Sequence, residues 1–441
     1  MAGGDSARAG TTSIPGPLSV ELVEATRPGA PAHRRAGTDD GAGVGRHPLR
    51  WPDTCAVLLL VVVGVVLPAL LALGAHAFDI PRNDDWAYRR ALEGFTRTGH
   101  ISMAGWGAMT LVGQIFWATP FMLLLGDRSW VPGLAVAVLS GLGLVAAYAL
   151  ARSLLDWGRA VAACLLLLAL PGFAPNTSSY MTDVPAFAAE AGCLALGLVA
   201  LCRSRSSRWA WLAASLAVGA FGFSIREFDL AAPVAVLAVL IVRDRRRLSR
   251  YFLAGAPLAL ACGLTYWWAA HLPGSQHKAL GLPSLATLRS MLGAFFTLAL
   301  FVSPVLPFAW RRQRWPPRRS GVIGAAACLA GGIWLIAGHA PVLIGNYLTR
   351  SGAEGAQVLA GYRPGLFPRP FWDVLQGTAL GAGTALTFVA CNGIRVRRPL
   401  PRSPAGESLV KAFLWMSTAG LVAYGLFVRA SLFDRYLWPL S

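Results

Sequence analysis

Arginine-rich connections recur between long apolar stretches of this sequence, and they limit what the chain can fold into. Five of them hold two to five arginines each and alternate with arginine-poor connections; they lie at 152–159, 203–208, 243–250, 311–319 and 394–402. This alternation is typical of a polytopic membrane protein, in which the basic loops stay in the cytoplasm. We therefore predict an all-α integral membrane protein.

The composition agrees with a membrane protein and excludes several other classes. Hydrophobic residues make up 55% of the 441 residues, charged residues make up 14%, and the mean hydropathy is +0.53. Soluble domains average about 25% charged residues, so an ordinary soluble enzyme and a disordered chain are both excluded. The excess of 39 basic over 21 acidic residues marks cytoplasmic loops and gives no reason to expect a nucleic-acid partner. The seven cysteines lie in or beside apolar runs without metal-ligand spacing, so we expect small buried side chains.

The arginine clusters also decide how many apolar stretches cross the membrane. Twelve stretches follow residue 55, and if all of them crossed, the five clusters would lie outside the cell. The weakest stretch is 107–125, which carries Gln114, Pro120 and a tryptophan, and placing it at the membrane interface puts every cluster inside. We therefore predict about 11 transmembrane helices plus interfacial helices in the first outer loop, with a cytoplasmic N-terminus and an outer C-terminus.

Two regions follow from this topology. Residues 1–50 are rich in Gly, Ala, Pro, Thr and Arg without apolar periodicity, which predicts a disordered cytoplasmic tail. Residues 51–441 form the predicted transmembrane domain of a multi-pass protein of the plasma or inner membrane. Its main outer loops are predicted at 78–130, 175–185, 271–289 and 341–372.

Three aspartates of the predicted outer face are candidates for chemistry. Asp84 and Asp85 begin a segment in which Tyr88, Leu92 and Phe95 share one helical stripe, which predicts an amphipathic surface helix. Asp183 precedes Val-Pro at the start of a later span. Helix capping explains one acid at each position, but carboxylates close to the hydrocarbon are costly and point to a base or a metal ligand. Asp84 and Asp85 are the catalytic candidates, and Asp183 is a substrate-binding candidate.

Basic and aromatic residues of the same face are candidates for binding an anion. Arg226 lies in a very short turn, where it either pairs with a neighbouring acid (Glu227 or Asp229) or binds a phosphate. Arg363 lies in a long loop rich in Gly and Pro. Arg435 and Tyr436 belong to the final Asp-Arg-Tyr-Leu-Trp-Pro, where they bind substrate or anchor the chain at the interface.

The order of these features resembles a known family. A first span precedes an outer loop with an acidic pair, an interfacial helix, a cytoplasmic arginine turn, Thr-Asp-Val-Pro and the terminal Asp-Arg-Tyr-Leu. This arrangement is similar to the GT-C superfamily of membrane glycosyltransferases, and more narrowly to its protein O-mannosyltransferase and aminoarabinose transferase group. The resemblance implies that Asp84 or Asp85 is the catalytic carboxylate and that Asp183 shares its cavity.

Two departures from that group are visible. The Glu-Lys-Pro-Pro stretch of the aminoarabinose transferases is absent, with Ser102–Met109 in its neighbourhood, which puts that sugar in doubt. The chain also ends soon after its Asp-Arg-Tyr motif, where relatives usually continue, so a short, truncated or inactive member is expected.

The resemblance implies an inverting enzyme that transfers a sugar from a polyprenyl-phosphate-linked donor to a hydroxyl of an envelope glycan, lipid or protein. Asp84 or Asp85 would be the general base, and the arginines would stabilise the leaving lipid phosphate. A divalent cation such as Mg or Mn, held by Asp84, Asp85 and Asp183, is the one cofactor under consideration. The alternatives are a transporter or flippase for an anionic or lipid-linked precursor, and an inactive scaffold for envelope assembly.

Overall fold

The computed structural model divides the chain into two units, residues 1–45 and 46–441, and every described residue belongs to the second. The described residues are 51–80, 82–103, 105, 109–276, 278–305, 326, 330, 342–349, 352–353, 368–391, 403–428 and 432–440. The predicted tail 1–50 therefore lies outside the described residues.

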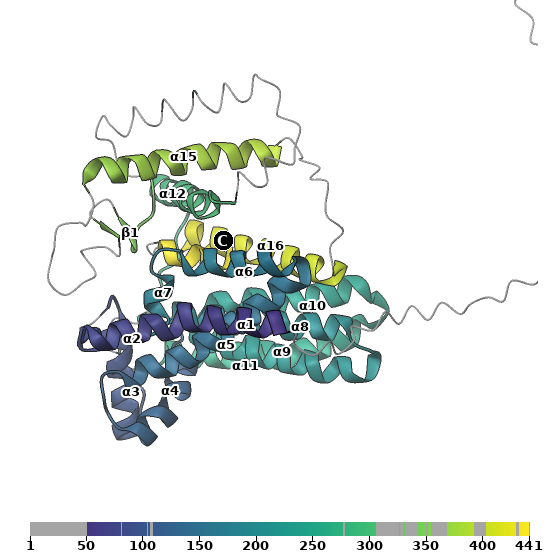
Figure 1. Cartoon of the computed structure of the whole chain (residues 1–441). Helices are drawn as coiled ribbons and strands as arrows, with labels where there is room; N and C mark the ends of the chain where they lie inside the picture. The colour runs from purple at the N-terminus through teal and green to yellow at the C-terminus, as the bar shows by residue number, and fades with distance from the viewer. Residues whose placement is uncertain are drawn as a thin grey trace, which may run out of the picture. The chain divides into compact units, whose positions relative to one another are not determined.

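Helices dominate the described part of the chain (Figure 1). The first half contains α1 (Trp51–Val61), the π-helical turn η1 (Val62–Val66), α2 (Leu67–Gly74), η2 (Ala77–Asp79), α3 (Asp85–Thr98), α4 (Val112–Leu125), α5 (Val131–Leu154), α6 (Trp157–Leu168), α7 (Phe173–Asn176), α8 (Asp183–Cys202) and α9 (Arg205–Ile225). The second half contains η3 (Glu227–Leu230), α10 (Ala231–Arg243), η4 (Arg245–Arg247), α11 (Leu248–Ala270), α12 (Leu285–Val302), α15 (Arg369–Cys391), α16 (Pro404–Phe427) and η5 (Asp434–Leu440). Two short antiparallel strands, β1 (Leu348–Thr349) and β2 (Gly352–Ala353), pair with each other.

The prediction of an all-α polytopic membrane protein is confirmed. Seven helices of the described part are long and apolar enough to cross a membrane: Trp51–Gly74, Val131–Leu154, Asp183–Cys202, Ser207–Ile225, Arg245–Ala270, Leu285–Val302 and Pro404–Phe427. The helix α4, in the stretch expected at the interface, has 14 residues and is about 21 Å long, short of the roughly 30 Å hydrocarbon core. The count of eleven spans remains a prediction.

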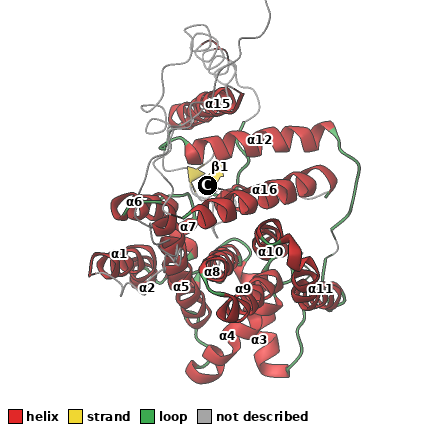
Figure 2. Cartoon of the chain, turned by 90° about the vertical axis from the view of Figure 1, so that its right-hand side faces the viewer, coloured by secondary structure: helices red, strands yellow, loops and turns green. Residues whose placement is uncertain are grey.

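The helix α8 lies at the centre of the packing. Within its membrane window 61% of the residues are buried, against 17–44% in the other six candidate spans, and it packs mainly between α5 and α9 (Figure 2). Small residues permit this close approach: a Cβ on Gly143 of α5 would lie 2.7 Å from the Cα of Ala188. Because its sides are held by neighbouring helices, α8 presents its first residue, Asp183, in a fixed position.

A glycine directly before α7 packs against a tyrosine from the C-terminal part of the chain. Gly172 has φ +76°, and a Cβ there would lie 2.4 Å from the ring of Tyr347. The hydroxyl of Tyr347 accepts a hydrogen bond of 2.6 Å from Asn176 Nδ2, and its ring stacks on Trp438 at 5.9 Å. Only glycine combines this backbone conformation with this close ring contact.

Replacing this glycine is expected to destabilise the protein. In Gly172→Ala, the left-handed backbone costs about 1–2 kcal/mol and the clash with Tyr347 adds to it, so the free energy of unfolding should fall by about 2 kcal/mol. Gly94 lies inside α3 with nothing within 4 Å of an added Cβ. Gly94→Ala should therefore raise the free energy of unfolding by about 0.5–1 kcal/mol, because alanine favours the helix. Thermal unfolding of the two variants in detergent measures both effects, and equal melting temperatures would contradict this account.

Candidate active site

Four side chains from separate parts of the sequence form a row of alternating charge, which we call the charge chain: Asp84, Arg435, Asp183 and Arg226. Arg435 Nη2 donates a hydrogen bond of 3.1 Å to Asp84 Oδ2, and its Nε lies 3.4 Å from Asp183 Oδ1. Arg226 Nη1 donates to the same Asp183 oxygen. The structure thus brings together two of the three predicted carboxylates and two of the three predicted arginines.

The charge chain is buried except at one end. The side chains of Arg435 and Asp183 are each 1% exposed and that of Arg226 is 7% exposed, whereas that of Asp84 is 16% exposed. Burial disfavours the charged form of Arg435, but Asp183 and the surrounding tyrosines together raise the pKa of the guanidinium, which therefore stays charged. Buried charges held this way are expensive, so they indicate function.

Besides Arg435 Nε, which lies in the ion pair with Asp183, two buried atoms of the charge chain have no hydrogen-bond partner among the described residues. One is Arg435 Nη1, a donor, and the other is Asp183 Oδ2, an acceptor. A buried polar atom without a partner costs about 1–3 kcal/mol. These two atoms are therefore candidates for binding a substrate, with the donor suited to a phosphate oxygen and the acceptor to a hydroxyl.

Local structure explains where each charge lies. The predicted helix start at Asp183 is confirmed, but Thr182 does not cap it, because its hydroxyl contacts Met109 Sδ at 3.6 Å. The Asp183 carboxylate instead faces the arginines. Arg226 follows the end of α9 in extended backbone and pairs with Asp183. Within the described residues, Arg226 forms no ion pair with Glu227 or Asp229, the two sequence neighbours expected as alternative partners.

The two aspartates of the first outer loop face different surroundings. Asn83 has φ +54°, a turn after which Asp84 points to Arg435. The Asp85 carboxylate is buried and accepts hydrogen bonds from the Arg82 backbone N–H at 2.8 Å and from Ser179 Oγ at 3.2 Å. Burial raises the pKa of Asp85, although these contacts act in the opposite direction. Asp85 thus connects the first outer loop to the segment before α8, and Asp84 reaches the charge chain.

The short helix η5 brings three consecutive residues to the site. Asp434 accepts backbone hydrogen bonds from Tyr347 and Leu348 at 2.9 and 2.8 Å, and from Arg435 at 2.8 Å. Burial raises the pKa of the Asp434 carboxyl, and these three N–H groups limit the rise. The ring of Tyr436 lies 4.6 Å below the Arg226 guanidinium and 5.7 Å from that of Arg435.

Some residues around the site had no distinct signal in the sequence. The sequence pattern places Tyr88 only on the apolar stripe of its helix, yet its buried hydroxyl lies 3.5 Å from Asp84 Oδ2. Its place one helical turn after Asp84 could have revealed this contact. Lys278 and Glu227 form an ion pair of 3.1 Å that links loops 51 residues apart. The remaining candidate, Arg363, lies outside the described residues.

Within the part of the chain that the structure describes, no group of three His, Cys, Asp or Glu side chains is placed to hold a metal ion. The reason is visible at the three predicted ligands. Asp85 turns toward Ser179, while Asp84 and Asp183 are joined through the cation of Arg435. These positions do not fit a divalent cation bound by the three carboxylates together.

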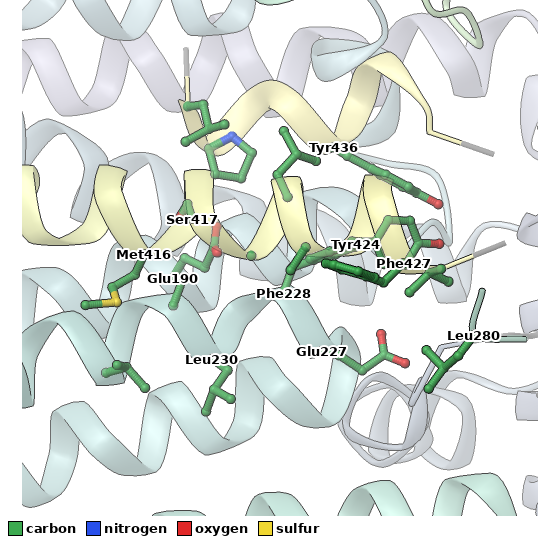
Figure 3. A pocket seen from close by; sticks show the side chains of 18 residues that line it. Glu190, Glu227, Phe228, Leu230, Leu280, Met416, Ser417, Tyr424, Phe427 and Tyr436 are labelled. Carbon is green, nitrogen blue, oxygen red and sulfur yellow. The ribbon is translucent and has the colours of Figure 1, made fainter. Parts of the chain in front are cut away.

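An apolar cavity of about 540 Å³ adjoins the charge chain at Tyr436 (Figure 3). It lies among η3, α10, α16 and η5, and Leu280 also lines it. Figure 3 shows Glu190 and Met416 toward one end of the cavity and Glu227 toward the other. The cavity therefore joins an apolar surface to a row of charges.

Fold and site together define a polytopic membrane protein with a charged site at the ends of its helices. Residues 114–268 match the model of the family described as dolichyl-phosphate-mannose-protein mannosyltransferase. The resemblance to membrane glycosyltransferases expected from the sequence is confirmed over this segment, which includes Asp183 and Arg226. A search of the curated proteins finds no match.

Several solved structures match the chain, among them two of ArnT and one of an oligosaccharyltransferase. The ArnT protein from Cupriavidus metallidurans bound to undecaprenyl phosphate is 18% identical, with a TM-score of 0.42 over 84% of this chain and 65% of that chain. Its apo state is 18% identical, with a TM-score of 0.41 over 85% of this chain and 78% of that chain. The apo oligosaccharyltransferase from Archaeoglobus fulgidus is 13% identical, with a TM-score of 0.33 over 88% of this chain and 55% of that chain. The present chain therefore spans 65% of the first of these chains.

The contacts of Asp434 predict a structural role for this carboxylate. In Asp434→Asn, an amide NH₂ replaces one oxygen and faces a backbone N–H, so the free energy of unfolding should fall by about 1–3 kcal/mol. Asp127 pairs with Arg97 at 2.7 Å where both side chains are more than half exposed, so Asp127→Asn should change it by less than about 1 kcal/mol. Thermal unfolding in detergent separates the two variants. An equal fall in melting temperature in both variants would show that the three hydrogen bonds of Asp434 do not stabilise the fold.

Proposed function

We propose that this protein is an inverting glycosyltransferase that works on the outer face of the plasma or inner membrane. It transfers a sugar from a polyprenyl-phosphate carrier to an acceptor hydroxyl. The observation that carries the proposal is the direction of the charge chain. At one end lies Asp84, its most exposed side chain, and at the other lies Arg226, stacked on a tyrosine that lines the apolar cavity. One end suits an acceptor arriving from water, and the other suits a lipid phosphate.

Asp84 is the general base in this proposal. Its side chain is 16% exposed, whereas that of Asp183 is 1% exposed and contacts both arginines. An acceptor hydroxyl can reach Asp84 without breaking the buried pairs. The neighbouring Asp85 takes a positioning role, because its carboxylate oxygens accept hydrogen bonds from Arg82 and Ser179.

Arg226 binds the phosphate in this proposal, with Arg435 beside it. The Tyr436 ring below Arg226 also lines the cavity, so a prenyl chain in the cavity would place its phosphate close to this guanidinium. Arg435 Nη1 supplies a further donor without a partner among the described residues. A buried guanidinium binds phosphate strongly, because its charge is little screened and its donors are planar.

The reaction then proceeds as a single displacement. The acceptor oxygen attacks the anomeric carbon, its proton passes to Asp84, and the bond from the anomeric carbon to the phosphate oxygen breaks. The leaving lipid phosphate keeps the electron pair, and the guanidinium of Arg226 stabilises its growing negative charge. Asp183 Oδ2, an acceptor with no hydrogen-bond partner in the described part of the chain, orients a sugar hydroxyl between the two ends. No step is assigned to a metal ion.

A carrier of lipid-linked precursors remains the second candidate because of one residue. Glu190 is buried within α8, 4% exposed, and lines the apolar cavity. Ionisable groups inside spans mark transport pathways in many carriers. Vesicles loaded with a radiolabelled polyprenyl-phosphate sugar distinguish the two functions: a carrier moves the label across the membrane, whereas the proposed enzyme forms a new glycosidic bond.

Substituting each aspartate of the first loop tests the base. Asp84→Asn should insert like the wild type but lose about 10²- to 10⁴-fold in transfer rate per folded molecule, because the proton acceptor is gone. Asp85→Asn should chiefly lower the melting temperature, since it weakens the contacts with Arg82 and Ser179. Counting labelled product per folded protein measures the transfer rate, and thermal unfolding in detergent measures the melting temperature. Full activity in both variants would remove Asp84 and Asp85 from the mechanism.

A further inference from the structure

The loop between α11 and α12 crosses from the first outer loop to the end of α16. We call its residues 273–276 and 278–281 the outer strap. The Met103 backbone N–H donates a 2.7 Å hydrogen bond to the carbonyl of Pro273, and the Gly281 N–H donates one of 2.8 Å to the carbonyl of Phe427. Gly274 has φ +75°, and a Cβ there would lie 1.9 Å from the Met103 carbonyl oxygen. The outer strap is therefore held in place on both sides of Lys278.

Lys278 is one of two lysines in a chain that otherwise uses arginine for its basic charge; the other is Lys411. Its Nζ lies 3.1 Å from Glu227 Oε1 and 5.6 Å from the centre of the Tyr424 ring. The side chains of Lys278 and Glu227 are each 22% exposed. This pair is partly exposed, so water screens it more than the buried pairs of the charge chain, and the lysine can change partner at a lower cost than they can.

This ion pair lies where the cavity meets the charge chain. Glu227, Tyr424 and Leu280 all line the cavity, and Glu227 directly follows Arg226 (Figure 3). A phosphate bound to Arg226 with its chain in the cavity would therefore lie beside a carboxylate that repels it. The nearby ammonium of Lys278 is the group that can remove this repulsion, because its four-carbon stem is flexible and carries three donors.

We propose that Lys278 is a phosphate-binding residue that leaves Glu227 and binds the phosphate of the lipid-linked ligand when this enters the cavity. This inference rests on the proposed function. Arg226 is held by Asp183 and Tyr436, so it binds the phosphate from a fixed position, while Lys278 closes over it from the outer strap. The phosphate that remains after transfer carries more negative charge than the donor, so Lys278 holds the product more strongly than the substrate.

Binding of two lipids to the full chain in detergent tests this inference. The probes are a long-chain polyprenyl phosphate and the polyprenol of the same length, which lacks the charge. Lys278→Met should weaken binding of the phosphate about tenfold, as expected for the loss of one charge-assisted hydrogen bond, and leave binding of the polyprenol unchanged. The control is Lys411→Met, because Lys411 pairs at 2.6 Å with Glu407 near the start of α16. It should change neither affinity.

Glu227→Gln provides the second arm. Without its competitor Lys278 is free, so binding of the phosphate should tighten several-fold, and this gain should shrink in the Lys278→Met background. A gain of the same size in both backgrounds would mean simple repulsion by Glu227 and would overturn the exchange of partners. An equal loss for both lipids in Lys278→Met would assign the lysine to packing of the outer strap, and no loss for either would remove it from the site.

The two proposals fail in different ways. If the wild type binds polyprenyl phosphate no better than polyprenol, the proposed function fails, and the role of Lys278 fails with it. If the wild type prefers the phosphate and Lys278→Met keeps that preference, only the role of Lys278 is overturned.

Discussion

The ion pairs of Arg435 hold together parts of the chain that are distant in sequence. Arg435 and Asp84 are 351 residues apart, and both Asp84 and Asp183 contact the same buried guanidinium. Desolvation makes such pairs poor sources of net stability, yet removing one partner leaves an uncompensated buried charge that costs about 3–5 kcal/mol. The start of α3, the start of α8 and η5 must therefore reach their positions together.

The positions of the charged residues could be predicted because the membrane restricts where charges lie. Arginine clusters orient the spans, and the orientation assigns every connection to one face. This reasoning selected six of the 21 acidic and 39 basic residues: Asp84, Asp85, Asp183, Arg226, Arg363 and Arg435. The structure joins four of them, Asp84, Arg435, Asp183 and Arg226, in one row of contacts. The amphipathic helix α3 was equally predictable, because Tyr88 and Leu92 recur at helical spacing in the sequence. The structure buries both side chains.

Side-chain directions and long-range partners could not be predicted in the same way. Asp84 and Asp85 are adjacent, and local features decide which one turns toward the arginine: the positive φ of Asn83, the Arg82 backbone N–H and the hydroxyl of Ser179. Asp434 looks like part of a substrate motif, yet its oxygens accept backbone N–H groups of residues 86 and 87 positions away. Contacts of this kind depend on how the helices pack, and sequence periodicity does not report packing.

The scarcity of lysine has a practical consequence. Lys278 lies beside Tyr424, near the end of α16, while Lys411 lies on α16 13 residues before Tyr424, about 20 Å along the helix axis. The Lys411 side chain is 53% exposed and that of Lys278 is 22% exposed. One transmembrane helix thus has a side-chain amine near each of its ends. Membrane-impermeant acylating reagents applied from either side would therefore report the orientation of the native protein without any engineered label.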